Sequence, residues 1–134
     1  MKFNIAKAKR KLDRLFSQYI LTRDNRTCKR CRWDGGKVDT SHIIPRSILA
    51  TRWLPENAIT LCVSCHKYGK ESWHQNPLSS IRWLDSVRGI DNNNILLTES
   101  TKPFKFTKEK YEEILSEIIS KISTVSKIKE HKQY

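Results

Sequence analysis

The feature that most constrains this chain is the spacing of its cysteines. All four cysteines of the 134-residue sequence lie in two C-x-x-C motifs, one formed by Cys28 and Cys31 and the other by Cys62 and Cys65. Two residues between the members of a pair let both sulfurs of a tight turn face one metal ion. Two disulfides or four free thiols are the alternatives. In a reducing compartment such paired motifs favour a metal.

Zinc is the metal that this ligand set favours, because four thiolates complete its tetrahedral coordination in structural sites. The insert between the two motifs is longer than that of a simple zinc ribbon, so it must carry something else. Four thiolates leave no open position for water or phosphate, and a catalytic metal would need other ligands. The candidates near the motifs are His42, His66, His74 and Asp39.

The formal net charge of +12 indicates an anionic partner, with nucleic acid as the first candidate. A soluble basic protein without such a partner is the alternative. No apolar run approaches the roughly 18 residues that span a bilayer, so we expect no membrane partner. The N-terminus also lacks the apolar core and cleavage site of a signal peptide. A cytoplasmic location is the resulting expectation.

Apolar residues at helical spacing predict an amphipathic helix over residues 4–23. Its basic residues include Arg10, Lys11 and Arg14, in the quarter of the chain that holds most of the net charge. We interpret these three side chains as contacts to DNA phosphates, which supply affinity without reading sequence. A solvated helix face is the alternative interpretation.

Short strands are expected on both sides of a connecting loop. The turn signal Asp34-Gly35-Gly36 precedes a predicted strand over residues 37–44, with His42 near its end. Residues 46–57 predict a connecting loop that can include a helical turn. A second strand is predicted over residues 58–61, directly before the second cysteine pair.

Helices dominate the predicted C-terminal part of the chain. One begins at Pro77 and ends before Gly89, followed by a polar loop over residues 91–94. A last helix is predicted to begin at Thr107, which is a suitable N-cap. The tail over residues 127–134 is predicted to be frayed. The last helix carries an apolar stripe of Tyr111, Ile114, Leu115, Ile118, Ile119, Ile122 and Val125. We expect this stripe to pack on the N-terminal helix, with a homodimeric coiled coil as the alternative.

Three motifs follow the first cysteine pair along the chain, and the last of them contains the second pair. They are Ser41-His42-Ile43-Ile44-Pro45-Arg46, then Glu56-Asn57, then Cys62-Val63-Ser64-Cys65-His66. Together with the first cysteine pair, this order resembles the zinc-bound HNH nucleases of the ββα-metal fold. The downstream Trp73-His74-Gln75-Asn76-Pro77 and Trp83 make the likeness closest to the NinG-like phage recombination nucleases.

The resemblance implies an α+β fold in which a small zinc-stapled ββα-metal (HNH) core is flanked by N- and C-terminal helices. We expect three parts: a basic amphipathic helix over residues 1–24, the zinc-bound HNH core over residues 25–77, and a helical extension over residues 78–134. The extension includes the long C-terminal helix.

The resemblance also implies roles for single residues. His42 matches the general base that activates water, and Asn57 matches the residue that fixes the loop beside it. His66 matches a ligand of the catalytic Mg²⁺ or Mn²⁺. The sequence departs from the family at Ser41, because many HNH sites carry an acid or a histidine there as a metal ligand. Asp39 and His74 are the two candidates to replace that ligand.

The implied function is a metal-dependent DNA endonuclease that hydrolyses phosphodiester bonds. The resemblance suggests double-stranded or branched recombination DNA as substrate. Arg30, Arg46 and Arg52 lie near the motifs and join the three basic residues of the N-terminal helix as expected DNA contacts. Two alternatives stay open: a zinc-stabilised DNA-binding module without catalysis, and an interaction protein that dimerises through its last helix.

Overall fold

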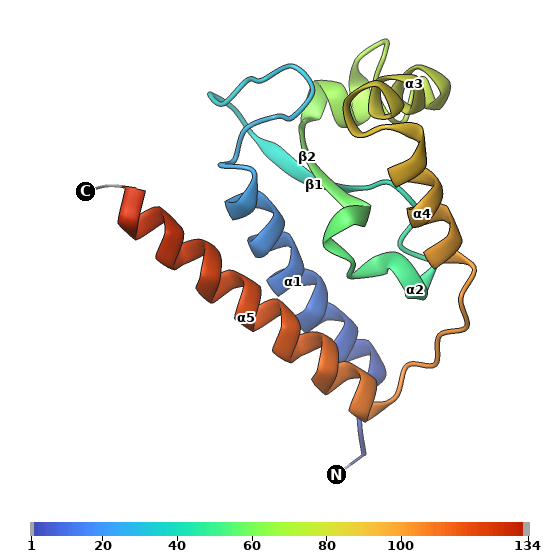
Figure 1. Ribbon diagram of the computed structural model, residues 1–134, viewed down its shortest axis with the longest axis vertical. Helices are drawn as coiled ribbons and strands as arrows, with labels where there is room; N and C mark the ends of the chain where they lie inside the picture. The colour runs from blue at the N-terminus through green and yellow to red at the C-terminus, as the bar shows by residue number, and fades with distance from the viewer. Residues whose placement is uncertain (1, 133–134) are drawn as a thin grey trace.

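The computed structural model describes residues 2–132 (Figure 1). The elements follow in the order α1 (Ile5–Arg23), β1 (Val38–His42), α2 (Leu49–Arg52), η1 (Pro55–Asn57), β2 (Ala58–Cys62), η2 (Ser64–Tyr68), α3 (Pro77–Arg88), α4 (Ile90–Ser100) and α5 (Lys108–Lys132). This is the expected α+β fold, with a small sheet between N- and C-terminal helices. Among residues 2–132, none of the helices combines the length and apolar character needed to cross a bilayer.

Helix α1 is fixed at both ends. The Asn4 side chain caps it by accepting a hydrogen bond from the Lys7 backbone N–H at 3.0 Å. At its C-terminal end, the buried Asp24 carboxylate accepts hydrogen bonds from the Arg23 guanidinium at 2.8 Å and from the Thr60 backbone N–H at 3.1 Å. Because Thr60 belongs to β2, these bonds tie the end of α1 to the sheet.

Strands β1 and β2 pair antiparallel, with His42 opposite Ala58 and Thr40 opposite Thr60. Every residue of β2 is buried, because both faces of this strand are covered. Ala58 joins the core formed with α1 and α5, whereas Ile59 and Leu61 join a second core formed with α3. The sheet therefore lies between two apolar clusters.

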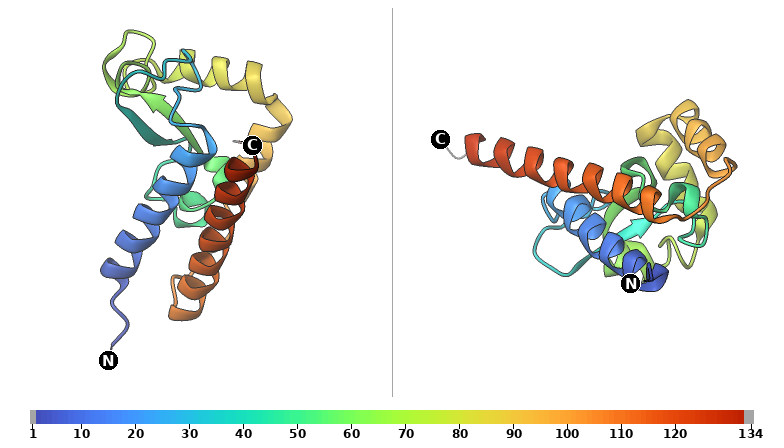
Figure 2. Two further views of the ribbon diagram at one scale, coloured as in Figure 1. Left: turned by 90° about the vertical axis from the view of Figure 1, so that its left-hand side faces the viewer. Right: turned by 90° about the horizontal axis from the view of Figure 1, so that it is seen from below.

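Helix α5 lies beside α1 and runs in the same direction, as Figures 1 and 2 both show. Its N-cap is Thr107, whose Oγ1 accepts from the Lys110 backbone N–H at 3.1 Å. The ring of Phe3, just before α1, packs on Tyr111 near the start of α5 at a centroid distance of 5.6 Å. The expected packing of the apolar stripe on the N-terminal helix is confirmed for Tyr111, Ile114, Leu115, Ile118 and Ile122, whereas Ile119 is exposed. Dimerisation through the same helix stays a prediction.

Two local predictions are wrong. Residues 91–94, expected as a polar loop, belong to α4. Gly89, with a φ of 88°, breaks the chain direction between α3 and α4, and Asp91 suits the first turn of the new helix. The tail from residue 127 is helical as far as Lys132 instead of frayed, while residues 133–134 lie outside the described part of the chain.

Two adjacent isoleucines of α5 test the packing of this helix on α1. Ile118 is 3% exposed in the core, whereas Ile119 is 51% exposed. We expect Ile118→Ala to lower the free energy of unfolding by about 2–5 kcal/mol, and Ile119→Ala to change it by less than about 0.5 kcal/mol. Urea unfolding of the two variants measures the difference. Equal effects would contradict the observed packing.

Candidate metal and histidine site

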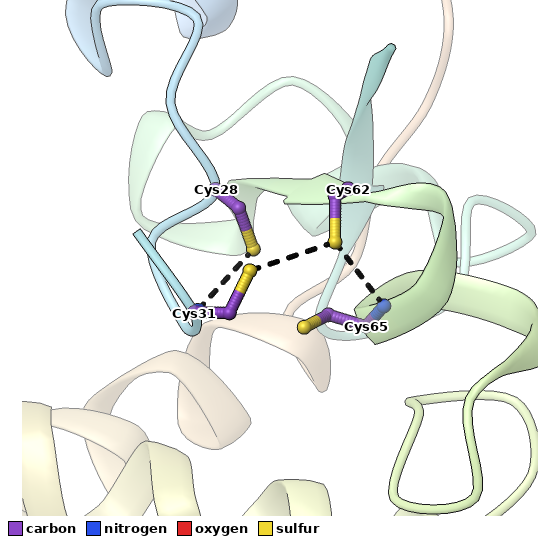
Figure 3. Close-up of side chains that lie close together, drawn as sticks. All are labelled: Cys28, Cys31, Cys62 and Cys65. Atoms are coloured by element: carbon purple, nitrogen blue, oxygen red, sulfur yellow. Dashed lines mark hydrogen bonds between the residues drawn. The ribbon is translucent and has the colours of Figure 1, made fainter. Parts of the chain in front are cut away.

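The four cysteines gather around a common point (Figure 3). Their sulfur atoms all lie within 4.8 Å of one another. Cys31 Sγ and Cys62 Sγ are 3.7 Å apart. Four thiolates bound tetrahedrally to zinc at about 2.3 Å would place their sulfurs about 3.8 Å apart. The cysteines are therefore positioned to bind a metal ion, and the ligand set suits zinc.

Each C-x-x-C motif forms a tight turn in which the backbone points toward a sulfur. The Cys31 N–H donates to Cys28 Sγ and the Cys65 N–H donates to Cys62 Sγ, both at 3.5 Å. Burial opposes ionisation of Cys28, but backbone N–H groups outweigh it and lower the pKa of this thiol from 9.0 to about 7. Burial and the neighbouring cysteines raise the pKa of Cys65. A bound cation would counter the mutual repulsion of four thiolates.

Two hollows share His42, His66 and Arg46 in their linings, and we call them the histidine hollows. The first is lined by Thr40, His42, Ile43, Pro45, Arg46, His66, Trp73 and His74. The second is lined by Asp13, Phe16, Ser17, Asp39, Thr40, His42, Arg46, His66 and Lys67. His42, His66 and Arg46 thus line both, so the structure brings together residues from β1, η2 and the loop after β1.

His42 is the last residue of β1, and its ring packs against Phe16 of α1 at a centroid distance of 5.8 Å. Its Nε2 lies 3.0 Å from the backbone carbonyl oxygen of Arg52. A carbonyl only accepts hydrogen bonds, so Nε2 carries the proton and Nδ1 carries the lone pair of the neutral ring. Burial lowers the pKa of His42 below 6.5, which favours this neutral form at pH 7.

Asn57 is fully buried and holds the loop that follows His42. Its Oδ1 accepts from the Ile44 backbone N–H at 2.7 Å, and its Nδ2 donates to the Ile44 carbonyl at 3.1 Å. The Asn57 carbonyl accepts from the Ile43 N–H at 2.8 Å. Three hydrogen bonds from one residue therefore restrain the chain directly after His42.

His66 lies on η2, a short π-helical turn of five residues that follows β2. The Asp39 Oδ2 atom lies 3.3 Å from His66 Nδ1, and the His74 ring packs edge-on against the His66 ring at 4.7 Å. A proton on Nδ1 donated to Asp39 would leave Nε2 available to a metal, as in carboxylate–histidine–metal arrangements. Burial lowers the pKa of His66, although the bond to Asp39 opposes this shift.

The three candidate ligands of a catalytic metal do not form a closed set. Among the Cys, His, Asp and Glu side chains of residues 2–132, a group of three or more with all donor atoms within 4.8 Å of one another is formed by the four cysteines. His66 contacts both Asp39 and His74. The donor atoms of these three residues, however, do not surround a common point as the four sulfurs do. Ser41 is 1% exposed, and it is not among the described residues that line the histidine hollows.

The predicted DNA contacts divide into two groups. Arg10, Lys11, Arg14 and Arg46 are exposed. By contrast, Arg52 is paired with Asp13 at 2.6 Å, and Arg30 donates to the Glu71 carbonyl at 2.6 Å and to Ser80 Oγ at 2.9 Å. These internal partners give Arg30 and Arg52 a role in the fold. Their assignment as DNA contacts stays a prediction, as it does for the exposed group.

Sequence reasoning did not identify the residues that α1 contributes to the histidine hollows. Asp13 and Ser17 line the second hollow, and Ser17 Oγ lies 2.9 Å from Thr40 Oγ1 of β1. Asp13 is the one acidic residue between Ile5 and Arg23, among many basic residues. That isolated negative charge was the one feature of the sequence that could have pointed to Asp13. Its hydrogen-bond partners, Arg52 and Trp53, are distant in sequence and could not be inferred from it.

Comparison with known proteins supports a nuclease assignment for part of the chain. Residues 28–70 match the HNH endonuclease family. The matched segment contains the four cysteines, both strands, His42, Asn57 and His66, and it covers less than half of the chain. No curated protein and no solved structure matches the chain significantly. The family match suggests nuclease activity with a metal site, and it makes DNA the expected partner.

Metal analysis tests the assignment of the cysteines. We expect one zinc ion per chain, because four sulfurs complete its coordination, and we expect Cys62→Ser to lose it and to lower the unfolding temperature. His66→Ala is the matched control, since His66 lies next to Cys65 but outside the sulfur cluster. Inductively coupled plasma mass spectrometry measures the zinc content. Loss of zinc from His66→Ala would show that the histidine is a zinc ligand.

Proposed function

We propose that the protein is a metal-dependent DNA endonuclease in which His42 is the general base and His66 binds the catalytic metal. The observation that carries the proposal is the shared lining of the histidine hollows. His42, with its proton held on Nε2, and His66, held by Asp39, face the same space within the segment that matches HNH endonucleases.

Hydrolysis in this site requires one proton transfer to His42. The neutral ring accepts a proton from water on Nδ1 while the water oxygen forms a bond to phosphorus. The bond from phosphorus to the leaving ester oxygen breaks, and that oxygen takes a proton from solvent. The imidazolium then returns its proton to solvent. The Arg52 carbonyl keeps the ring oriented, and its contact with Nε2 becomes stronger when the ring is positively charged.

Mg²⁺ or Mn²⁺ would supply a positive charge that stabilises the charge developing on the phosphoryl and leaving oxygens. We propose that the few donors around His66 hold such an ion. Mg²⁺ sites commonly use few protein ligands, and water and substrate phosphate complete the coordination. Here His66 offers Nε2, and Asp39 orients the ring through Nδ1. We therefore propose Asp39 chiefly as the orienting partner of His66, with His74 as a further ligand candidate at 4.7 Å between rings.

The DNA is proposed to contact basic residues around the hollows. Arg46 is exposed and lines both of them, and Lys67 lines the second. The exposed Arg10, Lys11 and Arg14 of α1 extend the basic surface, where phosphate contacts supply affinity without sequence recognition. We propose double-stranded DNA, including branched recombination intermediates, as the substrate class.

A second candidate function is a zinc-stabilised DNA-binding module without catalysis. The buried Ser41, at the position where an acidic ligand is common, favours this candidate. So does the lack of convergence of Asp39, His66 and His74 described above. A divalent metal that binds beside His66, and that cutting requires, separates the two functions.

Cleavage assays with the zinc-loaded protein test the proposed function. With Mg²⁺ or Mn²⁺, the wild-type protein should cut DNA from a panel of linear, flap, single-stranded and four-way substrates. His42→Ala should lose at least about 100-fold in rate, because general base catalysis contributes roughly 10²–10⁴-fold, while it keeps its zinc and its DNA affinity. Wild-type cutting by this variant would refute the role of His42. DNA binding without cutting by the wild-type protein would favour the second candidate.

The pH dependence of cutting provides a separate test. The base must be neutral, and burial lowers the pKa of His42 below 6.5. Protonation should therefore stop the reaction only as the pH falls through a value below 6.5, and the rate should be constant from there to neutral pH. Single-turnover rates between pH 5 and 8 measure this limb. A midpoint above 6.5 would contradict a buried base.

A further inference from the structure

Asp13 of α1 makes an unusually complete set of contacts with α2 and the residue after it. Its Oδ1 accepts from Arg52 Nε at 3.1 Å and from Trp53 Nε1 at 2.9 Å. Its Oδ2 accepts from Arg52 Nη2 at 2.6 Å. The carboxylate thus forms a bidentate ion pair with the guanidinium and also accepts a hydrogen bond from the Trp53 ring. Asp13 lies outside the segment 28–70 that matches the HNH endonuclease family.

The other end of Arg52 contacts the proposed base. Its backbone carbonyl is the group 3.0 Å from His42 Nε2. Its guanidinium also donates to the Arg46 carbonyl at 3.4 Å. Helix α2 is four residues long and has no side-chain cap at its N-terminus, so its own backbone offers little rigidity. The position of the Arg52 carbonyl therefore depends on contacts made by the side chains of Arg52 and Trp53.

We propose that Asp13 is a positioning residue for His42, acting through Arg52 and Trp53 to hold the Arg52 carbonyl against Nε2. The effect on cutting rests on the proposed function, whereas the effect on the His42 ring does not. This gives α1 a part in the active site beyond the binding of DNA phosphates. It also gives Arg52 a role besides the expected contact to DNA.

The contacts argue against two other roles for Asp13. It lines the second histidine hollow together with Asp39 and His66, which suggests a metal ligand. Its two oxygens, however, already accept three hydrogen bonds, two of them from a guanidinium that would compete with a cation. Charge disfavours a contact to a DNA phosphate, since two anions repel each other.

Asp13→Asn is the decisive variant, because an amide has one acceptor oxygen and cannot grip the guanidinium with two. We expect kcat to fall on the order of 10- to 100-fold, the scale of a small misplacement of a reacting group. We expect KM for DNA not to rise, because the change removes a negative charge beside a basic hollow. Asp91→Asn is the matched control: it removes the same charge from an exposed site on α4 and should keep the wild-type kcat.

A spectroscopic measurement reports on the His42 ring directly. In the wild-type protein the Nε2 proton donates to the Arg52 carbonyl, and this bond should slow its exchange enough to give a downfield imidazole N–H resonance. The resonance is assigned by its absence in His42→Gln. We expect it to be lost or shifted in Asp13→Asn and retained in Asp91→Asn. Loss of global stability alone would not remove this signal from the folded protein.

The outcomes separate the proposal from the function on which it partly rests. A folded Asp13→Asn protein with the wild-type kcat, or with an unchanged His42 N–H resonance, overturns the proposal. If Asp13→Asn does not fold, Arg52→Lys replaces it with the same expectations for kcat and for the His42 resonance, because an ammonium group cannot form the two hydrogen bonds of the guanidinium. If the wild-type protein cuts no DNA, the proposed function fails, and the resonance still decides whether Asp13 positions His42.

Discussion

The cysteine cluster closes one end of a sheet that has little stability of its own. Two paired strands are marginal in water unless something packs on them or joins them. Here Cys62 ends β2, and Cys28 follows the turn that leaves α1, so a metal held by both cysteine pairs would join these segments. His66 lies immediately after the last cysteine. Whatever fixes the cluster therefore also fixes the start of η2 and the position of this histidine.

Helix α1 supports the same sheet from the other side. Asp24 binds the Thr60 N–H, Ser17 contacts Thr40, and Phe16 packs on the ring of His42. Burial would raise the pKa of Asp24, but the hydrogen bond from Arg23 and the other groups around it outweigh burial and lower the pKa. The carboxylate consequently stays charged at the junction of helix and strand. The pair of Asp24 and Arg23 therefore joins α1 to β2, the strand that leads to Cys62.

Much of the fold follows from local sequence patterns, whereas the details of the site do not. The cysteine spacing indicates one cluster, and apolar periodicity indicates α1 and α5, because both patterns report geometry within a short segment. Residues 91–94 look like a loop because three consecutive asparagines favour turns, yet the helix around them buries Leu96. The ion pair between Asp13 and Arg52 joins residues that are distant in sequence and become neighbours only in the folded chain. The burial of Ser41 likewise depends on both sides of the sheet.

The group that orients His42 belongs to the main chain. Every amino acid at position 52 would offer a carbonyl oxygen, so substitution there does not delete the acceptor itself. Natural selection can act on this contact only through the side chains that keep the carbonyl in place. A comparison of position 52 alone would then understate its importance, since the relevant unit is the pair formed with position 13. If Asp13 positions His42 as proposed, related sequences should show the covariation of positions 13 and 52 more clearly than the conservation of position 52 alone.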